Sequence, residues 1–461
     1  MKTAEQHTEP VNPHDVIPRP CHVRFQRALR NRCRVYQLHH DQVRRDAREC
    51  LGVSKEPNVK RGFLPTALIA ASILGRIIAA QPASDPEELY RARRWFELRE
   101  TLTPASSPLL RAAVANAFNE RQTAERLLLG IVKSRPRPGF ANDAYGMLCQ
   151  LYARTGQYAR FLTTHREWRL AFPDSAEMLR EKENEGKFSG RPDQKSSPRQ
   201  HAILRHEDEA FSIPVSVNGK AGEYLFDTGA WQSVVTEPEA KRLGLAVREG
   251  KHEITDPSGT RVAYRTAVAR EVTIGGMRFS DVSFAVYPAP PYAPDAEVGI
   301  VGMPILIQTG SIRWSRSGTV ELGGAVPRVS TPNLVFSDSR LLLRADFQGR
   351  TGLAVLDTGA TTTDFNANFA SLFADLLARN GTKGTQEING IGGTRVFESV
   401  TLPEFTMTIG PKVVSLRPAT ITLQQNALIG GNCCLANLGG DVLKQAQSVS
   451  IDFSAMALLL E

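Results

Sequence analysis

The sequence predicts a multidomain protein in which an N-terminal all-α helical-repeat domain precedes two homologous β-barrel-like lobes. Three observations predict this arrangement. Apolar residues recur at helical spacing between residues 85 and 182, short strand-like runs replace them after residue 203, and that later region contains an internal repeat. A chain of 461 residues is also too long for one hydrophobic core, so several domains are expected.

The positive charge of the chain is concentrated at its N-terminus. Of the formal net charge of +8, residues 1–62 contribute +6, with 13 Lys and Arg against 7 Asp and Glu. The remainder is nearly neutral, which argues against a nucleic-acid partner. Residues 1–62 lack apolar periodicity, so we predict a basic disordered arm or a mis-assigned translation start. Their cysteines are too widely spaced for a zinc site, and we expect no metal and no other cofactor.

An apolar segment, residues 63–83, follows Lys60 and Arg61. It has the layout of a secretory signal: a basic start, an apolar run and small residues at its end. It is either a signal peptide behind a mis-assigned start or a membrane anchor behind a cytoplasmic arm, and a buried core helix is the third interpretation. The first two predict an exported protein, periplasmic or membrane-anchored.

Helical patterns occupy residues 85–182. The stretch DPEELYRARRWFELRE begins with an Asp cap and a Pro, as helices commonly do. Two later helical hairpins place Ala124 and Ala159 35 residues apart, close to the tetratricopeptide period of about 34 residues. The region therefore resembles a tetratricopeptide domain, which implies a groove for a protein partner. A helical cap packed on the next domain fits the same pattern.

Residues 186–200 are polar and rich in Gly, Ser and Pro, so we predict a linker that is also a candidate for self-cleavage. The strand-like runs that follow form two lobes, residues 203–325 and 333–461. Each lobe contains an apolar strand that leads into Asp-Thr-Gly-Ala, in YLFDTGAWQSVV and AVLDTGATTTDF. The two aspartates, Asp227 and Asp357, are 130 residues apart. The tetrapeptide GTRV also recurs in both lobes, so an ancestral duplication is the economical explanation.

These motifs resemble those of aspartic peptidases, pepsin-like in having two lobes on one chain and most similar to the bacterial retropepsin-like branch. The resemblance covers residues 203–461 and implies the bilobal acid-protease fold, with Asp227 and Asp357 as the catalytic pair. Packing segments beneath the two loops are implied at Ile300-Val301-Gly302 and Asn437-Leu438-Gly439, although residues 428–431 compete for the second.

Further roles follow from the same resemblance. It implies that the catalytic loops are supported by Thr228, Gly229, Ala230, Ser233, Thr358, Gly359, Ala360 and Thr363. It implies substrate-covering flaps at Asp256, Pro257, Ser258, Gly259 and Thr260, and at Gly390, Ile391, Gly392 and Gly393. The first flap has no tyrosine at its tip, and Tyr264 lies on the returning arm.

Two carboxylates suit peptide hydrolysis because, when they are held close together, one proton is shared between them. The pair can then deprotonate an attacking water and protonate the carbonyl oxygen. Ala230 and Ala360 stand where pepsin-like members carry a hydroxyl that stabilises the ionised carboxylate. Its absence predicts an optimum at weakly acidic to neutral pH.

The expected function is an aspartic endopeptidase that acts as a monomer on peptide or protein substrates. Two other interpretations remain open. Each Asp-Thr-Gly is also compatible with a simple turn, and the fold can serve as an exported, non-catalytic scaffold that binds a peptide or partner. A serine or zinc hydrolase has little support, because neither Gly-x-Ser-x-Gly nor His-Glu-x-x-His occurs.

Overall fold

The computed structural model describes residues 85–134, 138–206, 211–256, 258–291, 293–327, 331–424 and 433–461. Every described residue belongs to one compact unit of the chain, Ala80–Glu461. The predicted arm, residues 1–62, and the predicted signal or anchor, residues 63–83, lie outside the described residues. Within the described ranges, no helix combines the length and the apolar character needed to cross a membrane.

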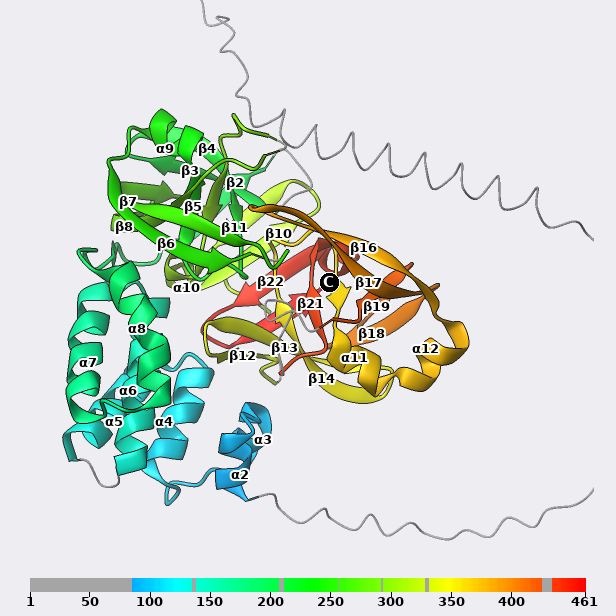
Figure 1. The fold of residues 1–461 in the computed structure, drawn as a ribbon, viewed down its shortest axis with the longest axis horizontal. Helices are drawn as coiled ribbons and strands as arrows, with labels where there is room; N and C mark the ends of the chain where they lie inside the picture. Colours follow the sequence, from blue (N-terminus) through cyan, green and yellow to red (C-terminus); the bar gives the residue numbers. More distant parts are fainter. Residues whose placement is uncertain are drawn as a thin grey trace, which may run out of the picture. The chain divides into compact units, whose positions relative to one another are not determined.

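Helices occupy the first part of the described chain (Figure 1). They are α2 (Pro86–Arg91), α3 (Trp95–Thr101), α4 (Pro108–Ala117), α5 (Arg121–Ser134), α6 (Pro138–Arg154), α7 (Tyr158–Ala171) and α8 (Ala176–Phe188). Capping side chains define several of their starts. Asp85 accepts a hydrogen bond from the amide of Glu87, and Ser107 accepts one from the amide of Leu109. Such caps satisfy amide groups that have no partner within the helix.

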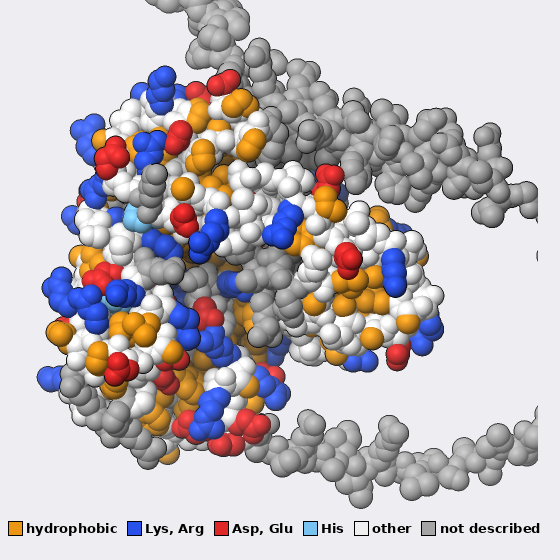
Figure 2. Space-filling view, in the orientation of Figure 1, with side chains coloured by type: hydrophobic (Ala, Val, Ile, Leu, Met, Phe, Trp, Pro, Cys, Tyr) orange, Lys and Arg blue, Asp and Glu red, His pale blue; other side chains and the backbone are white. Residues whose placement is uncertain are grey.

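From α4 to α8, each helix packs against the next in the chain. Their shared core is rich in aromatic rings, and Trp168 stacks on Tyr145 with ring centroids 6.5 Å apart. On the face shown in Figure 2, acidic and basic side chains are interspersed over these helices. The helices also contact the β region, since the Arg154 guanidinium lies over the Phe336 ring and Asn119 donates to the carbonyl of Phe453.

Residues 186–200, predicted as a linker, are mostly exposed or partly exposed, and two of their side chains, Phe188 and Arg191, are buried. Helix α8 continues to Phe188, whose ring is fully buried. Arg191 is 3% exposed, and β1 (Lys195–Ser196) pairs with β8 (Met277–Tyr287). The other polar residues of the segment are exposed or partly exposed, as its composition suggests, whereas Phe188 and Arg191 pack on surfaces formed by other elements.

The first part of the β region forms a sheet with the strand order β1-β8-β5-β9-β4-β3-β7-β6. Strand β7 also pairs with β8, which closes the sheet on itself. The elements are β3 (Ser212–Val217), β4 (Lys220–Phe226), β5 (Ser233–Thr236), α9 (Glu237–Leu243), β6 (Val247–Thr255), β7 (Arg261–Ile274), β9 (Gly299–Val301) and α10 (Met303–Thr309). Alternating side chains of these strands fill the interior, which is the expected consequence of a two-residue period.

The second part forms a sheet with the order β16-β17-β20-β15-β21-β14-β13-β18-β19, and β12 pairs with β13. Its elements are β12 (Leu334–Ser337), β13 (Arg340–Phe347), β14 (Arg350–Leu356), β15 (Asp364–Phe365), α11 (Ala367–Leu372), α12 (Ala374–Asn380), β16 (Thr382–Gly390), β17 (Gly393–Leu402), β18 (Phe405–Ile409), β19 (Lys412–Leu416), β20 (Ala419–Thr422), β21 (Ala436–Leu438) and α13 (Gly440–Leu443). The run β20-β15-β21-β14-β13 has the same order as β8-β5-β9-β4-β3 in the first part.

A third sheet joins the two parts of the β region. It contains β2 (Ala202–Arg205), β11 (Thr319–Leu322), β10 (Ser311–Ser315), β22 (Ser448–Asp452) and β23 (Ala457–Leu460), in that order. Strands β10 and β22 pair antiparallel, with Ser311 opposite Asp452 and Ser315 opposite Ser448 (Figure 1). Because this sheet takes strands from both parts, a single chain supplies both sides of the site described next.

Candidate active site

Each aspartate of the two Asp-Thr-Gly motifs stands immediately after a buried strand. Strand β4 leads into Asp227 and β14 leads into Asp357. A short parallel strand lies beside each, with β9 next to β4 and β21 next to β14. The amide of Asp227 donates to the carbonyl of Val301, and the amide of Asp357 donates to the carbonyl of Leu438, both at 3.0 Å. The second packing segment is therefore formed by Asn437-Leu438-Gly439, while the competing residues 428–431 lie outside the described residues.

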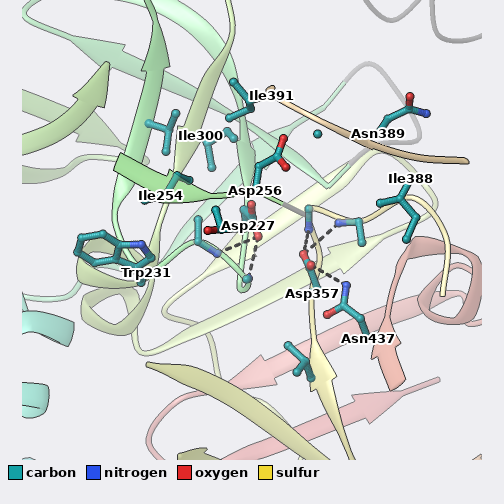
Figure 3. Close-up of a pocket in the computed structure, with 18 of the residues that line it drawn as sticks. Asp227, Trp231, Ile254, Asp256, Ile300, Asp357, Ile388, Asn389, Ile391 and Asn437 are labelled. Carbon is teal, nitrogen blue, oxygen red and sulfur yellow. Dashed lines mark hydrogen bonds between the residues drawn. The ribbon is translucent and has the colours of Figure 1, made fainter. Parts of the chain in front are cut away.

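The two loops meet so closely that each glycine faces the opposite aspartate. A Cβ atom built on Gly229 would lie 2.8 Å from Cγ of Asp357, and one on Gly359 would lie 2.4 Å from Cγ of Asp227. Real Cβ atoms do not approach other atoms this closely, so glycine is required at both positions. Figure 3 shows Asp227 and Asp357 side by side. The spacing of 130 residues in the sequence becomes direct proximity in the fold.

Backbone amides hold one oxygen of each carboxylate. Oδ1 of Asp227 accepts hydrogen bonds from the amides of Gly229 at 2.7 Å and Ala230 at 3.1 Å. Oδ1 of Asp357 accepts them from Gly359 and Ala360, both at 3.0 Å. Amide donors favour the ionised form of a carboxylate. Oδ2 of Asp227 accepts neither of these amide bonds and lies toward Gly359 of the other loop.

The two threonines tie the loops together reciprocally. The amide of Thr228 donates to Oγ1 of Thr358, and the amide of Thr358 donates to Oγ1 of Thr228, each at 3.0 Å. Each hydroxyl in turn donates to a carbonyl across the interface, Leu356 for Thr228 and Phe226 for Thr358, at 2.7 Å. Both threonines are buried. This closed network fixes the separation of the two aspartates.

Ser233 and Thr363 lie at equivalent positions of the two loops and make equivalent hydrogen bonds. Oγ of Ser233 accepts from the amide of Gly302, and Oγ1 of Thr363 accepts from the amide of Gly439. The hydroxyl and the amide of Thr363 also donate hydrogen bonds to the carboxylate of Asp441 at the start of α13. These bonds connect each aspartate loop to the packing segment beneath it.

The predicted flap residues lie at the tips of two hairpins. Asp256, Ser258, Gly259 and Thr260 are in the turn between β6 and β7, while Pro257 lies outside the described residues. Gly390 ends β16, Ile391 and Gly392 form the turn, and Gly393 begins β17. Tyr264 of the returning arm is buried against Tyr287 and His252, and it is not part of the cleft lining.

The two hairpin tips bind each other through Asp256. Its Oδ1 accepts from the hydroxyl of Ser258 at 2.6 Å and the amide of Thr260 at 3.0 Å. Its Oδ2 accepts from the amide of Gly392 in the other hairpin at 2.8 Å. The Asp256 side chain is 1% exposed. One carboxylate therefore links the hairpins across the cleft.

A cavity of about 1120 Å³ lies between the aspartates and the hairpins. Figure 3 shows Ile254 and Ile300 on the Asp227 side and Ile388 and Asn437 on the Asp357 side. The cavity is large enough for several side chains of an extended peptide. Within the described ranges, no group of three His, Cys, Asp or Glu side chains is placed to hold a metal ion.

Electrostatics distinguish Asp227 from an exposed carboxyl group. Burial raises the pKa of Asp227 well above its ordinary value, and the nearby charge of Asp357 raises it further. The amides of Gly229 and Ala230 act in the opposite direction. The two groups interact, so protons leave them as a pair. A proton is therefore retained at the pair to higher pH than on an ordinary aspartate.

Several residues of the site were not identified from the sequence. Nδ2 of Asn437 donates to Oδ2 of Asp357 at 2.8 Å, whereas the sequence analysis placed Asn437 only in a packing segment. Asp364, one residue after Thr363, lines the cavity and accepts from Nε2 of Gln386. Asn437 is a polar residue in an otherwise apolar run, a signal that could have marked it, whereas Asp364 follows three threonines and has no such signal.

The helical region supports the Asp227 loop. The Phe188 ring packs edge-to-face on Trp231, with centroids 5.8 Å apart. The guanidinium of Arg191 donates to Oε1 of Gln232 at 3.0 Å. Trp231 and Gln232 follow Ala230 directly in the chain. The corresponding residues of the second loop, Thr361 and Thr362, are exposed.

Comparisons with known proteins found a family match and a solved structure. Residues 213–305 match a family model described as an aspartyl protease. A retropepsin-like aspartic protease from Rickettsia conorii has a similar solved structure, with 18% sequence identity, coverage of 28% of this chain and 91% of that chain, and a TM-score of 0.21. No curated protein matches the chain. The family match covers residues 213–305, and the mostly β arrangement of the chain after residue 202 is consistent with an aspartic-protease fold.

Proposed function

We propose that this protein is a single-chain, two-lobed aspartic endopeptidase that hydrolyses peptide bonds with a water activated by Asp227 and Asp357. One observation carries the proposal. Two carboxylates from distant parts of one chain meet at a cavity, and a symmetric threonine network holds them there. The simple-turn interpretation gives no reason for that convergence, because a turn needs no partner loop.

In the proposed reaction, a water bound between the carboxylates attacks the peptide carbonyl carbon. The ionised aspartate takes a proton from this water, while the protonated one donates its proton to the carbonyl oxygen. Collapse of the tetrahedral intermediate breaks the carbon–nitrogen bond. The leaving nitrogen takes up a proton from the pair, and a hydroxyl group of the intermediate returns a proton to the pair as the new carboxyl group forms. The pair ends with one proton, as it began, so no cofactor is consumed.

The pH dependence follows from the shared proton. The raised pKa of Asp227, caused first by burial and then by the charge of Asp357, keeps that proton bound toward neutral pH. Activity is lost on the alkaline side when the proton leaves and on the acid side when both groups are protonated. We therefore expect an optimum at weakly acidic to neutral pH. An optimum near pH 2 would contradict this assignment.

The decisive experiment replaces each aspartate by its amide. The full chain and its Asp227→Asn and Asp357→Asn variants are incubated with an unstructured protein, and new N-termini are quantified. Because each substitution removes one proton-transferring group, we expect a loss of about 10³-fold or more in both variants. Asp375→Asn, on the exposed surface of α12 and outside the cavity lining, is the matched control and should keep wild-type activity. Equal cleavage by wild type and Asp227→Asn would contradict the proposed dyad, and no cleavage by wild type would favour the non-catalytic binding scaffold.

A further inference from the structure

The walls of the cleft beside the two aspartates are built on the same plan but differ in polarity. In the first part, Val234 of β5 lies directly opposite Ile300 of β9. In the second part, Asp364 of β15 lies directly opposite Asn437 of β21. Directly opposed residues of antiparallel strands have Cβ atoms about 5 Å apart on one face of the sheet. All four line the same cavity.

The polar pair is connected to the hairpin on its own side. Nε2 of Gln386, on β16, donates to Oδ1 of Asp364, and the hydroxyl of Thr422 donates to Oε1 of Gln386. The charges that act on Asp364 are those of Asp441 and Asp357, and both are acidic. This corner of the cavity therefore concentrates negative potential, while the Val234–Ile300 corner is apolar.

We propose that, in the endopeptidase function inferred above, Asp364 is a specificity-determining residue that selects a Lys or Arg side chain of the substrate, while the Val234–Ile300 wall accepts an apolar one. A substrate cation satisfies the carboxylate through a charge-assisted hydrogen bond. An apolar side chain in the same place leaves a half-buried carboxylate without that partner, which costs binding energy. The bond that is cleaved is therefore flanked by unlike side chains.

The titration of Asp364 gives the proposal a second measurable consequence, which is a pH-dependent preference for a basic side chain. Burial raises its pKa to about 6, Gln386 lowers it, and the charges of Asp441 and Asp357 raise it. The groups that face it are Gln386 on β16, Asn437 on β21, Asp357 after β14 and Asp441 at the start of α13. Asp364 is ionised above that pKa and protonated below it. The preference for a basic side chain should therefore increase between pH 5 and pH 7.

The test compares substrates that differ at one position. A peptide library is first digested with the full chain to locate the cleaved bonds. Matched peptides with Lys or norleucine next to the cleaved bond are then assayed with wild type, Asp364→Asn and Val234→Thr. Asn keeps an oxygen that can accept from Gln386 but removes the charge, so it separates specificity from structural support.

We expect kcat/KM for the Lys peptide to fall about 10- to 100-fold in Asp364→Asn, mainly through KM, because a bond to a charged group is replaced by a neutral one. The norleucine peptide should change by less than about 3-fold, and Val234→Thr should keep the wild-type preference for Lys. Apolar residues on both sides of the cleaved bonds, or an unchanged Lys preference in Asp364→Asn, overturn the proposal.

A binding measurement separates this proposal from the endopeptidase function on which it rests. Fluorescence anisotropy is measured with the same peptides and Asp227→Asn, with and without Asp364→Asn. Tighter binding of the Lys peptide that depends on Asp364 supports the specificity assignment even if no cleavage is found. Equal binding of both peptides contradicts it, whatever the activity.

Discussion

The loops around Asp227 and Asp357 have one backbone design and two different environments. Both aspartates accept two amide hydrogen bonds, and both are tied by the reciprocal threonine bonds. The first loop, however, is packed against the helical region through Trp231 and Gln232, and its cleft wall is apolar. The second loop is open at Thr361 and Thr362, and its cleft wall contains Asp364 and Asn437.

This difference shows which features the proposed chemistry constrains. Residues that set the separation of the carboxylates are the same in both loops, because the shared proton requires a symmetric contact. The residues that follow differ between the loops. Trp231 and Gln232 also pack against the helical region, whereas Thr361 and Thr362 are exposed, and all four line the cavity. We call the shared Asp-Thr-Gly-Ala residues the common layer and the residues around them the outer layer. Substitutions in the common layer should reduce activity in both loops, whereas equivalent substitutions in the outer layer should do so in only one.

The largest effect is expected where the two loops touch. Gly359→Ala and Gly229→Ala place a methyl group against the opposite aspartate and force the carboxylates apart. A displacement of about 1 Å in a catalytic group costs about 10²-fold in rate. We expect at least that loss in kcat, with Gly359→Ala the more severe because its Cβ lies closer to the opposite Cγ. Gly384→Ala, which has open space around it, is the matched control, and activity in Gly359→Ala near that of the control would contradict the contact.

The next largest effect is expected for the threonine network. Substitution of either threonine should lower the free energy of unfolding by a similar amount. Thr228→Val removes the hydroxyl that donates to Leu356 and accepts from Thr358, leaving buried backbone groups unsatisfied. Thr358→Val does the same in the opposite direction. Each should lower the free energy of unfolding by about 2 kcal/mol. Denaturant unfolding measures this, with the Ser variants as controls, and a large difference between the two Val variants would show that the network is not reciprocal.

The common layer is also the part that the sequence predicts best. Asp-Thr-Gly recurs after an apolar strand in each half, and this local pattern is visible without knowing the fold. Asp364 and Asn437 were not recognised as site residues, because their role depends on pairing between β15 and β21, which are far apart in the chain.

The docking of the helical region was harder still to predict. Arg191 lies in a segment whose Gly, Ser and Pro content predicts a linker. Its side chain is buried because Gln232 and two aromatic rings, Tyr158 and Phe188, surround its guanidinium. The composition of a segment indicates only its local conformational preference. The burial of Arg191 depends instead on a surface formed by other elements of the fold. The meeting of the hairpin tips through Asp256 and Gly392 is a long-range contact of the same kind.

A smaller effect should therefore appear when the helical support of the first loop is weakened. Arg191→Met keeps the packing volume but removes the hydrogen bond to Gln232. We expect kcat to fall about 3- to 10-fold with little change in KM, because Gln232 lies in the loop that carries Asp227. Thr362→Ala alters the corresponding, exposed position of the second loop and should stay within about 2-fold of wild type. Equal effects of the two substitutions would remove the proposed difference between the loops.

The smallest effect tests the outer layer of the second loop through Asn437. Asn437→Ile reproduces the residue of the first part, Ile300, and removes the amide that donates to Oδ2 of Asp357. That donor stabilises negative charge on the pair, so its loss should move the acid limb of the pH–rate profile upward by about half a pH unit and lower kcat about 3-fold. The control Asn437→Gln keeps a polar amide at this position, so it distinguishes loss of the hydrogen bond to Asp357 from loss of polarity. The profile of kcat/KM against pH measures the shift, and an acid limb that moves downward would mean that the Asn437 amide does not stabilise the ionised pair.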